Sequence, residues 1–415
     1  MDDQLQAIVI GGGHAGLAVS HELRERGIAH AVFERGRIGE SWRSQRWKSF
    51  RLNTPGWANT LPGMPFPGDD DGFGGADEVA RYLEAYCTAF ALPVRTGVAV
   101  TAVRSEGSGF VLEADGGPFA TQHVVIASGM QNVPRIPTMA AQLSPAIAQM
   151  HGAEYRHAGT LPDGRVLVVG AAQSGCQIVE DLLDAGREVL MATGRVTRVP
   201  RRYRGHDIVE WLVRSGFWAQ RPSDLPDPAM RSLPQPQISG VGGGHTISYQ
   251  HLARRGVHLL GHLSALDGTR ATFDGDLREH VRAADESRAR ALAMIDAYIA
   301  REGITAPPPE MDPADEPARY EEFSDEPTTC DLAAEGVTSV VWCTGFGGDF
   351  NWLPRGATLD GAPLHREGIG DLLGLYFVGL PWLARRDSGV IHGTGADATR
   401  IASAIAARLD RSESN

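Results

Sequence analysis

Cysteine is scarce in this sequence, and basic residues are outnumbered by acidic ones. The four cysteines, Cys87, Cys176, Cys330 and Cys343, stand far apart and form neither a CxxC pair nor a metal-type spacing. We therefore expect a reducing, cytoplasmic location, without a disulfide framework, a redox dithiol or a metal site. The net charge of −12 argues against a nucleic-acid partner, because phosphate binding requires clustered lysine and arginine.

Long hydrophobic runs are missing as well. No segment approaches the ~20 consecutive apolar residues that cross a bilayer, and the acidic start of the chain is unlike a signal peptide, so we expect no membrane partner. The hydrophobic fraction of 42% is ordinary for a globular protein, which argues against disorder. A length of 415 residues predicts two or three structural units.

Glycine, in contrast, is in excess. The 50 glycines make up about 12% of the chain, against roughly 7% in an average protein. A short apolar run at 7–10 leads directly into Gly11-Gly12-Gly13-His14-Ala15-Gly16. This order predicts a buried strand, a tight turn and a helix whose free N–H groups bind a pyrophosphate. Glu34 ends the next apolar run, where an acidic side chain would accept hydrogen bonds from a ribose.

The same pattern recurs further along the chain. The apolar run 165–169 precedes Gly170-Ala171-Ala172-Gln173-Ser174-Gly175, and the position equivalent to Glu34 is Thr193. Gly194 and Arg195 follow, and three more arginines stand close by, at Arg198, Arg201 and Arg202. A guanidinium pairs with a 2′-phosphate that a carboxylate would repel, so this loop is predicted to bind NADPH rather than NADH. The alternative for any single arginine is a place in a solvated loop.

Two nucleotide sites in one chain predict an electron relay. FAD would be held by the first loop, and a nicotinamide dinucleotide would deliver hydride from the second. The predicted fold is α/β, with two Rossmann-like dinucleotide-binding domains and the NADPH domain inserted in the FAD domain. We expect the FAD domain at 1–160 and 335–415, and the NADPH domain at 161–334, with a helical and irregular insertion at about 203–330.

Several further elements are expected from the sequence pattern. Helices are predicted at about 77–90, 277–302 and 396–409, strands at 98–103, 110–114 and 124–127, and an irregular Pro- and acid-rich segment at 306–327. Two more strands, 337–342 and 375–379, are interpreted as returns to the first domain.

Short motifs between these elements resemble those of a known family. The matching segments are Ile38-Gly39-Glu40-Ser41-Trp42-Arg43, Lys48-Ser49-Phe50-Arg51-Leu52-Asn53-Thr54, Pro65-Phe66-Pro67, Ala127-Ser128-Gly129, Cys343-Thr344-Gly345-Phe346 and the pair His151 and Tyr155. They resemble the flavin-containing monooxygenases, the two-dinucleotide-binding, class B flavin monooxygenase group that also includes Baeyer–Villiger and plant indole-pyruvate monooxygenases. The family fingerprint departs in its first half, where Pro145 and Ile147 replace the usual Phe and Gly.

The resemblance implies a function and a set of cofactor contacts. The function is insertion of one oxygen atom from O2 into a small organic substrate, with NADPH as reductant and a C4a-(hydro)peroxyflavin as the oxygenating species. The implied contacts to FAD and NADPH are Gly11, Gly13, Gly16, Glu34, Arg35, Ser41, Trp42, Val100, Ala127, Ser128, Gly129, Gly170, Ala172, Gln173, Ser174, Gly175, Gly194, Arg195, Thr344, Gly345, Gly379, Gly389 and Val390.

Asn53 is implied as the catalytic residue, a hydrogen-bond donor near N5 and C4a of the flavin. Its alternative role is to cap the turn Asn53-Thr54-Pro55-Gly56. His151 is interpreted as a hinge residue rather than as a general base. Two other functions stay open at this stage: a flavin oxidase or dehydrogenase of similar fold that inserts no oxygen, and a flavoprotein that acts as a binding or regulatory module.

Overall fold

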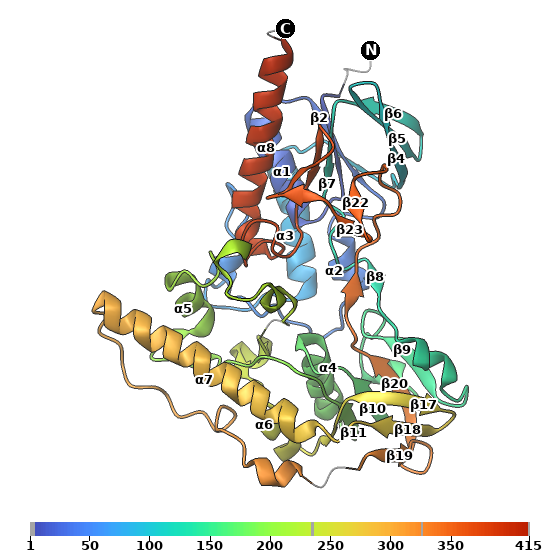
Figure 1. The fold of residues 1–415 in the computed structure, drawn as a ribbon, viewed down its shortest axis with the longest axis vertical. Helices are drawn as coiled ribbons and strands as arrows, with labels where there is room; N and C mark the ends of the chain where they lie inside the picture. The colour runs from blue at the N-terminus through green and yellow to red at the C-terminus, as the bar shows by residue number, and fades with distance from the viewer. Residues whose placement is uncertain (1–4, 234–235, 325–326, 414–415) are drawn as a thin grey trace.

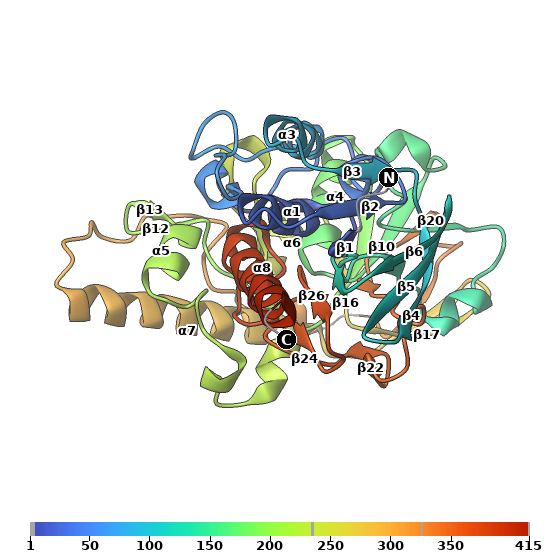
Figure 2. The same cartoon turned by 90° about the horizontal axis from the view of Figure 1, so that it is seen from above.

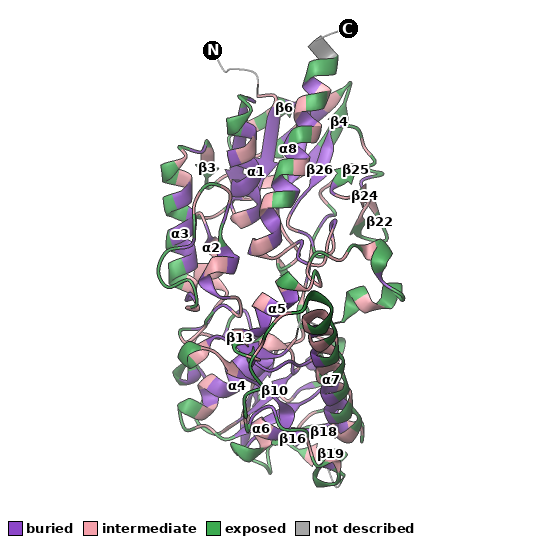
Figure 3. Cartoon of the chain, turned by 90° about the vertical axis from the view of Figure 1, so that its left-hand side faces the viewer, coloured by how far each residue is buried: buried purple, intermediate pink, exposed green. Residues whose placement is uncertain are grey.

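A computed structural model describes residues 5–233, 236–324 and 327–413. It contains two α/β units that lie one above the other along the long axis of the molecule (Figure 1). Buried strands form the centre of each unit, and the helices cover them (Figure 3). No helix among the described residues is both long and apolar enough to cross a membrane.

The first unit is built on a seven-stranded sheet in the order β24-β25-β26-β7-β1-β2-β3. Its parallel strands are β1 (Ala7–Ile10), β2 (His30–Glu34), β3 (Val94–Thr96), β7 (His123–Ile126) and β26 (Leu375–Phe377), and its antiparallel edge is β24 (His365–Arg366) and β25 (Ile369–Gly370). All four residues of β1 and of β7 are buried, as expected of parallel strands that are covered on both faces.

Helices and a small antiparallel sheet complete the first unit. The helices are α1 (His14–Glu25), α2 (Glu40–Ser44), α3 (Ala76–Ala89) and α8 (Ile391–Glu413), and the small sheet is β4 (Val100–Glu106), β5 (Gly109–Ala114) and β6 (Gly117–Thr121). Helices α1 and α8, which are far apart in sequence, pack side by side (Figure 2).

The second unit repeats this plan. Its sheet has the order β16-β11-β10-β20-β9, which matches the order β3-β2-β1-β7-β26 of the first. The strands, all parallel, are β9 (Ala148–His151), β10 (Arg165–Val169), β11 (Val189–Ala192), β16 (His258–Leu260) and β20 (Val337–Trp342). Its helices are α4 (Gln173–Asp184) and α6 (Tyr249–Arg254), and its antiparallel sheet is β17 (Leu263–Asp267), β18 (Arg270–Phe273) and β19 (Thr329–Asp331). The prediction of two Rossmann-like domains, one inserted in the other, is confirmed.

The strand 337–342 differs from its predicted place. The sequence assigned it to the returning part of the first domain, 335–415, but β20 pairs with β10 on one side and with β9 on the other. The chain therefore leaves the first unit earlier than predicted, at β8 (Val133–Pro134), and returns to it later, at β21 (Phe346–Gly347); these two strands pair antiparallel. Likewise β9 lies in the second sheet although it falls within 1–160. The strands of the two units are equally apolar, so the sequence does not show which sheet a buried strand joins.

The expected insertion contains short helices, one long helix and an irregular segment. Its helices are α5 (Ile208–Arg214) and α7 (Leu277–Glu302), the latter with the predicted bounds, and its short strands are β12 (Arg202–Tyr203), β13 (His206–Asp207), β14 (Ile238–Ser239) and β15 (His245–Thr246). Residues 306–324, which we call the acidic strap, are irregular apart from one 3-10 turn at Tyr320–Phe323, and residues 325–326 of the predicted segment lie outside the described residues.

The last helix and a small hairpin end the chain. Helix α8 begins at Ile391, five residues before the predicted start, because the glycines at Gly393 and Gly395 weakened the helical pattern of the sequence. The hairpin, β22 (Thr358–Leu359) and β23 (Ala362–Pro363), lies beside the first unit.

Candidate functional site

In the first glycine loop, two glycines have no room for a side chain, and a third has free space beside it. A Cβ atom on Gly11, whose φ is +117°, would lie 2.5 Å from the carbonyl oxygen of Ala127, and one on Gly16 would lie 1.9 Å from that of Gly11. A Cβ on Gly13 would meet nothing within 4 Å. Gly13 is also the N-cap of α1 and gives it no side-chain cap. The N–H groups at the start of α1 therefore face open space, which fits a bound pyrophosphate.

A second observation at this loop supports a bound cofactor. The hydroxyl Oγ of Ser128, in the linker that follows β7, is buried without a hydrogen-bond partner among the described residues. A buried polar group is normally paired, so this hydroxyl is suited to a ligand at the loop. The residues present at the first loop therefore fit a dinucleotide.

Glu34 holds the first glycine loop in place, at the position where the sequence predicts a ribose contact. Its carboxylate oxygens accept hydrogen bonds from the backbone N–H groups of Gly12 and Gly36, both at 2.7 Å. Each carboxylate oxygen can accept more than one hydrogen bond, so a ribose can still be bound. Arg35 beside it is exposed.

The second loop has the same geometry. A Cβ on Gly170, with φ +105°, would lie 2.5 Å from the carbonyl oxygen of Cys343, and one on Gly175 would lie 1.9 Å from that of Gly170. Ala172 is the N-cap of α4 and, like Gly13, provides no side-chain cap. Gln173 donates from Nε2 to the carbonyl oxygen of Pro236 at 2.9 Å, and Ser174 is exposed at the first turn of the helix.

The end of β11 carries the residues predicted to face the 2′-phosphate. Thr193 follows β11 as Glu34 ends β2, and its hydroxyl donates to the carbonyl oxygen of Leu260 at 2.7 Å. The carbonyl oxygen of Gly194 accepts from the hydroxyl of Tyr249 at 2.6 Å. Arg195 is exposed, so its guanidinium is free to reach a phosphate.

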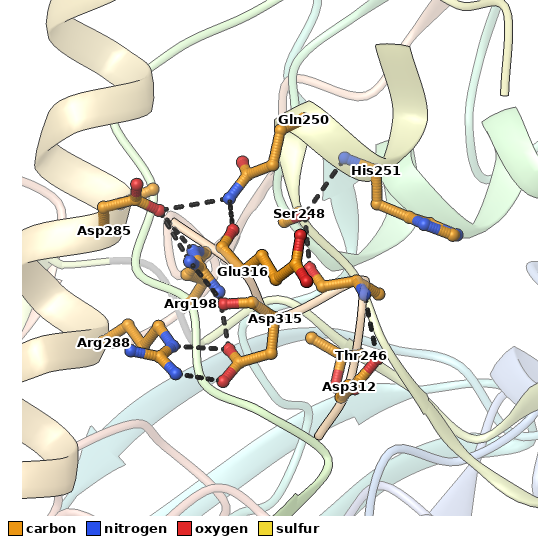
Figure 4. A network of polar contacts seen from close by, with 12 residues as sticks. Arg198, Thr246, Ser248, Gln250, His251, Asp285, Arg288, Asp312, Asp315 and Glu316 are labelled. Carbon is orange, nitrogen blue, oxygen red and sulfur yellow. Dashed lines mark hydrogen bonds and ion pairs between the residues drawn. The ribbon is translucent and has the colours of Figure 1, made fainter. Parts of the chain in front are cut away.

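Arg198 has a structural role instead. Its side chain is fully buried, its Nε donates to Asp285 Oδ1 and its Nη1 to Asp315 Oδ1, both at 2.8 Å. Arg288 of α7 also binds Asp315, so the network joins the acidic strap to α7 (Figure 4). Strap carbonyl oxygens accept from Ser248 and Gln250 at the start of α6.

Arg201 also has a structural role. It is 2% exposed and forms an ion pair with Asp207. Of the four arginines that follow Thr193, only Arg195 and Arg202 are exposed. The sequence could not separate these roles, because the carboxylate partners of Arg198 come from distant parts of the chain and the spacing of six residues between Arg201 and Asp207 predicts no contact by itself.

Asn53 lies where the two units meet. Its Oδ1 accepts a hydrogen bond of 2.5 Å from Nε2 of Gln177 on α4, and its carbonyl oxygen accepts from Nη1 of Arg201 at 2.9 Å. The turn at 54–56 is capped by another residue, Asn59, whose Nδ2 donates to the carbonyl oxygens of Thr54 and Pro55. The alternative of a turn-capping Asn53 is therefore not what the structure shows.

His151, at the end of β9, contacts the linker by which the chain returns to the first unit. Its Nε2 donates to the carbonyl oxygen of Gly345 at 3.0 Å, and its Nδ1 accepts from the N–H of Ala153 at 3.1 Å. Burial lowers the pKa of this imidazole, and both ring nitrogens are occupied. This geometry favours the hinge interpretation over a general base.

The other predicted contacts lie in α2, at the start of β4 and in the linkers that follow β7 and β20. Ser41 is exposed and Trp42 half-buried in α2, with the Arg46 guanidinium 5.1 Å from the Trp42 ring centroid. Val100 opens β4. Gly129 and Gly345 follow the two equivalent strands β7 and β20, and the hydroxyl of Thr344 donates to the carbonyl oxygen of Arg135.

Two further glycines lie beside the helices of the first unit. A Cβ on Gly379 would lie 2.8 Å from Cβ of Ala15 on α1. Gly389 and Val390 lie directly before α8. The sequence missed Gln177, which carried no motif of its own. Its one signal was its place one turn after Gln173 on the helix that follows the second glycine loop.

Known proteins share both the sequence and the fold of this chain. Residues 8–212 match the family described as Pyridine nucleotide-disulphide oxidoreductase. A CzcO-like oxidoreductase of Geobacillus kaustophilus is 30% identical over 96% of this chain and 97% of its own length. Indole-3-pyruvate monooxygenase YUCCA1 of Oryza sativa is 29% identical over 48% of this chain and 50% of its own.

Solved structures share the fold of this chain. The flavin-containing monooxygenase from Stenotrophomonas maltophilia superposes with a TM-score of 0.67 at 18% identity, covering 97% of this chain and 98% of its own. OTEMO, solved in complex with FAD and NADP, matches at a TM-score of 0.58 and 16% identity, over 98% of this chain and 85% of its own.

The chain is thus a flavoprotein oxidoreductase with two dinucleotide-binding domains. It belongs to the family of the CzcO-like oxidoreductases, and its fold is that of the flavin-containing monooxygenases. The prediction of FAD and NADPH as cofactors is supported by the pyridine-nucleotide family match and by OTEMO, which was solved with FAD and NADP, while the assignment of each cofactor to one loop stays a prediction.

Proposed function

We propose that this protein is an NADPH-dependent flavin monooxygenase that inserts one oxygen atom from O2 into a small organic substrate. The observation that supports the proposal is the position of Asn53, which Gln177 and Arg201 of the second unit hold where the two units meet. A polar side chain held at this junction can donate a hydrogen bond to an oxygen species formed there.

The chain would hold FAD at the first loop with Gly13, Glu34 and Ser128, and NADPH at the second with Ala172 and Arg195. FAD, when bound, would supply the redox chemistry that links oxidation of NADPH to activation of O2. Gln177 and Arg201 fix Asn53, so that its side-chain amide can donate a hydrogen bond to the oxygenating species, which favours oxygen transfer over release of peroxide. The free thiols of all four cysteines support a reducing, cytoplasmic location.

Oxygen-18 labelling tests the proposal. The purified protein, supplied with FAD, NADPH and labelled O2, is screened against amines, sulfides, thiols and ketones, and product mass is followed together with NADPH consumption. We expect one labelled oxygen atom in the product of at least one substrate class. NADPH consumption that yields only hydrogen peroxide would favour the flavin oxidase alternative, and NADPH consumption that no substrate stimulates would favour a binding module.

The cysteines argue against disulfide reduction. Burial raises the pKa of the Cys343 thiol to about 12, and that of Cys176 well above its usual value. A dithiol mechanism requires an accessible thiolate, which these two buried thiols do not supply.

A further inference from the structure

A histidine–aspartate pair lies where the second unit contacts the start of α8, and nothing proposed above uses it. His392 is the second residue of α8, and its Nδ1 lies 3.0 Å from Oδ2 of Asp387. The Asp387 side chain is only 2% exposed, and its Oδ2 also accepts a hydrogen bond from Arg385 at 3.0 Å. The other oxygen, Oδ1, is buried without a hydrogen-bond partner among the described residues.

Aromatic side chains from both units contact the imidazole. The ring of Trp57, from the first unit, lies 6.4 Å from that of His392, and the ring of Trp218, from the insertion, lies 5.2 Å away, both edge to face. The backbone N–H of Asp387 donates to the carbonyl oxygen of Trp218 at 3.1 Å, which fixes the two segments together. His392 thus lies in contact with aromatic rings from segments far apart in the sequence.

The pairing sets which nitrogen of His392 is available. A carboxylate beside Nδ1 holds the proton on that nitrogen and leaves a lone pair on Nε2. Nε2 makes no hydrogen bond with the described residues, and 27% of the side chain is exposed, so a small molecule can reach it. The charged groups nearby are Asp387, its partner Arg385, and Arg386, whose guanidinium stacks on Phe217 at 4.0 Å.

The electrostatic environment of His392 favours a group that gains negative charge. The N-terminal end of the 23-residue helix α8 is directly beside His392, and helix N-termini stabilise negative charge. Arg385 pairs with Asp387 and lies near Asp397, which pairs with Arg400, so the end of the helix is the feature that favours negative charge here. A neutral acid that loses a proton here gains stabilisation, whereas a protonated amine gains none.

We propose that His392 is a catalytic base of the substrate site and that Asp387 is its positioning residue. The substrate is a small, flat, largely apolar molecule with an acidic S–H or enol O–H group. That S–H or O–H bond breaks, its proton passes to Nε2 of His392, and its electron pair stays on the substrate. The resulting anion forms a bond to one oxygen of the peroxide that NADPH and O2 supply, the O–O bond breaks, and the second oxygen leaves with the electron pair, takes the proton from His392 and ends as water. This inference rests on the monooxygenase function proposed above, which supplies the oxidant and NADPH.

Paired substrates provide the test. Phenylmethanethiol carries an S–H group that stays protonated at neutral pH, and benzyl methyl sulfide has the same ring with a methyl group in place of that proton. We expect His392→Ala to slow oxygenation of the thiol by roughly a hundredfold, the lower range for loss of a general base, and to leave the sulfide almost unchanged. Added imidazole should restore part of the rate with the thiol, which a purely structural role would not allow.

A matched variant and a second readout complete the experiment. His262→Ala removes another histidine that is 3.0 Å from an aspartate, Asp274, on an exposed part of the second unit, and should leave both rates unchanged. Nitrogen–proton NMR correlations in the wild-type protein should show His392 protonated at Nδ1, and Asp387→Asn should weaken that preference.

The outcomes separate the two proposals. Equal loss on both substrates in a folded His392→Ala protein, or no loss on either, would overturn the role of His392 while oxygen labelling by the wild type keeps the monooxygenase. A wild type that labels neither product overturns the role of His392 for these substrates, and the broader substrate screen then decides the function. A wild-type imidazole protonated at Nε2 would also overturn the proposal.

Discussion

Gly13 and Ala172 occupy the same position in the two units and differ by one methyl group. Each is the N-cap of the helix that follows its glycine loop, with φ and ψ of −82° and −178° for Gly13 and −73° and −174° for Ala172. The first loop therefore permits a closer approach of a phosphate to the backbone than the second. This fits a tightly held FAD at the first loop and an exchangeable NADPH at the second.

Gly13→Ala should lower FAD affinity without unfolding the protein. The added Cβ meets no atom of the chain within 4 Å but enters the space assigned to the pyrophosphate. We expect a loss of FAD affinity of at least roughly tenfold, which corresponds to about 1.4 kcal/mol. Flavin absorbance and thermal unfolding of the apoprotein measure the two effects. Gly16→Ala is the contrast, because its Cβ would lie 1.9 Å from a backbone oxygen, and we expect it to destabilise the fold itself.

Arg195→Ala should reduce the preference for NADPH. Loss of a charged hydrogen-bond partner of a phosphate costs about 1.5–3 kcal/mol, which corresponds to a rise of roughly ten- to a hundredfold in KM for NADPH. The KM for NADH should change little, since NADH has no 2′-phosphate. Steady-state kinetics with both nucleotides measure this, and an equal loss for both would show that Arg195 does not contact the 2′-phosphate.

Arg198→Ala should lower the stability of the fold and leave the preference between NADPH and NADH unchanged. Removing this buried guanidinium leaves the carboxylates of Asp285 and Asp315 without their shared partner, at a cost of about 3–5 kcal/mol in the free energy of unfolding. We expect a lower Tm and increased proteolysis of the acidic strap, with an unchanged ratio of the KM values for NADPH and NADH in the protein that remains folded. A shift in that ratio would instead place Arg198 at the nucleotide.

Asn53→Ala and Gln177→Ala should act on one and the same step. Both remove the Gln177–Asn53 hydrogen bond, a loss of about 1 kcal/mol or roughly fivefold. We expect anaerobic flavin reduction by NADPH to be almost unchanged, while hydrogen peroxide rises at the expense of product. The double variant should be little worse than Asn53→Ala alone, because coupled residues are not additive. Full additivity would show that Gln177 acts independently of Asn53.

The sequence predicted the parts of the fold that depend on local pattern. Both glycine loops, the equivalence of Glu34 and Thr193, and the bounds of α7 followed from periodicity and spacing. Sheet membership of β20 did not, because it depends on which of two similar sheets the strand joins. The contacts of Arg198 with Asp285 and Asp315 join residues roughly 90 to 120 positions apart, and no local signal contains them. The same holds for Asn53 with Gln177 and for His392 with Trp57.

Helix α4 carries two functions on one rigid element. Its N-terminus forms the second dinucleotide loop, and Gln177, little more than one turn further along, contacts Asn53 in the other unit. Binding equilibria that share an element are reciprocal: if occupancy of the loop changes the affinity for a molecule at Asn53, that molecule changes the affinity for the nucleotide by the same factor. If NADPH binds at this loop and the substrate lies beside Asn53, the reductant and the substrate would therefore be thermodynamic effectors of each other, with the Gln177–Asn53 hydrogen bond as the shared contact.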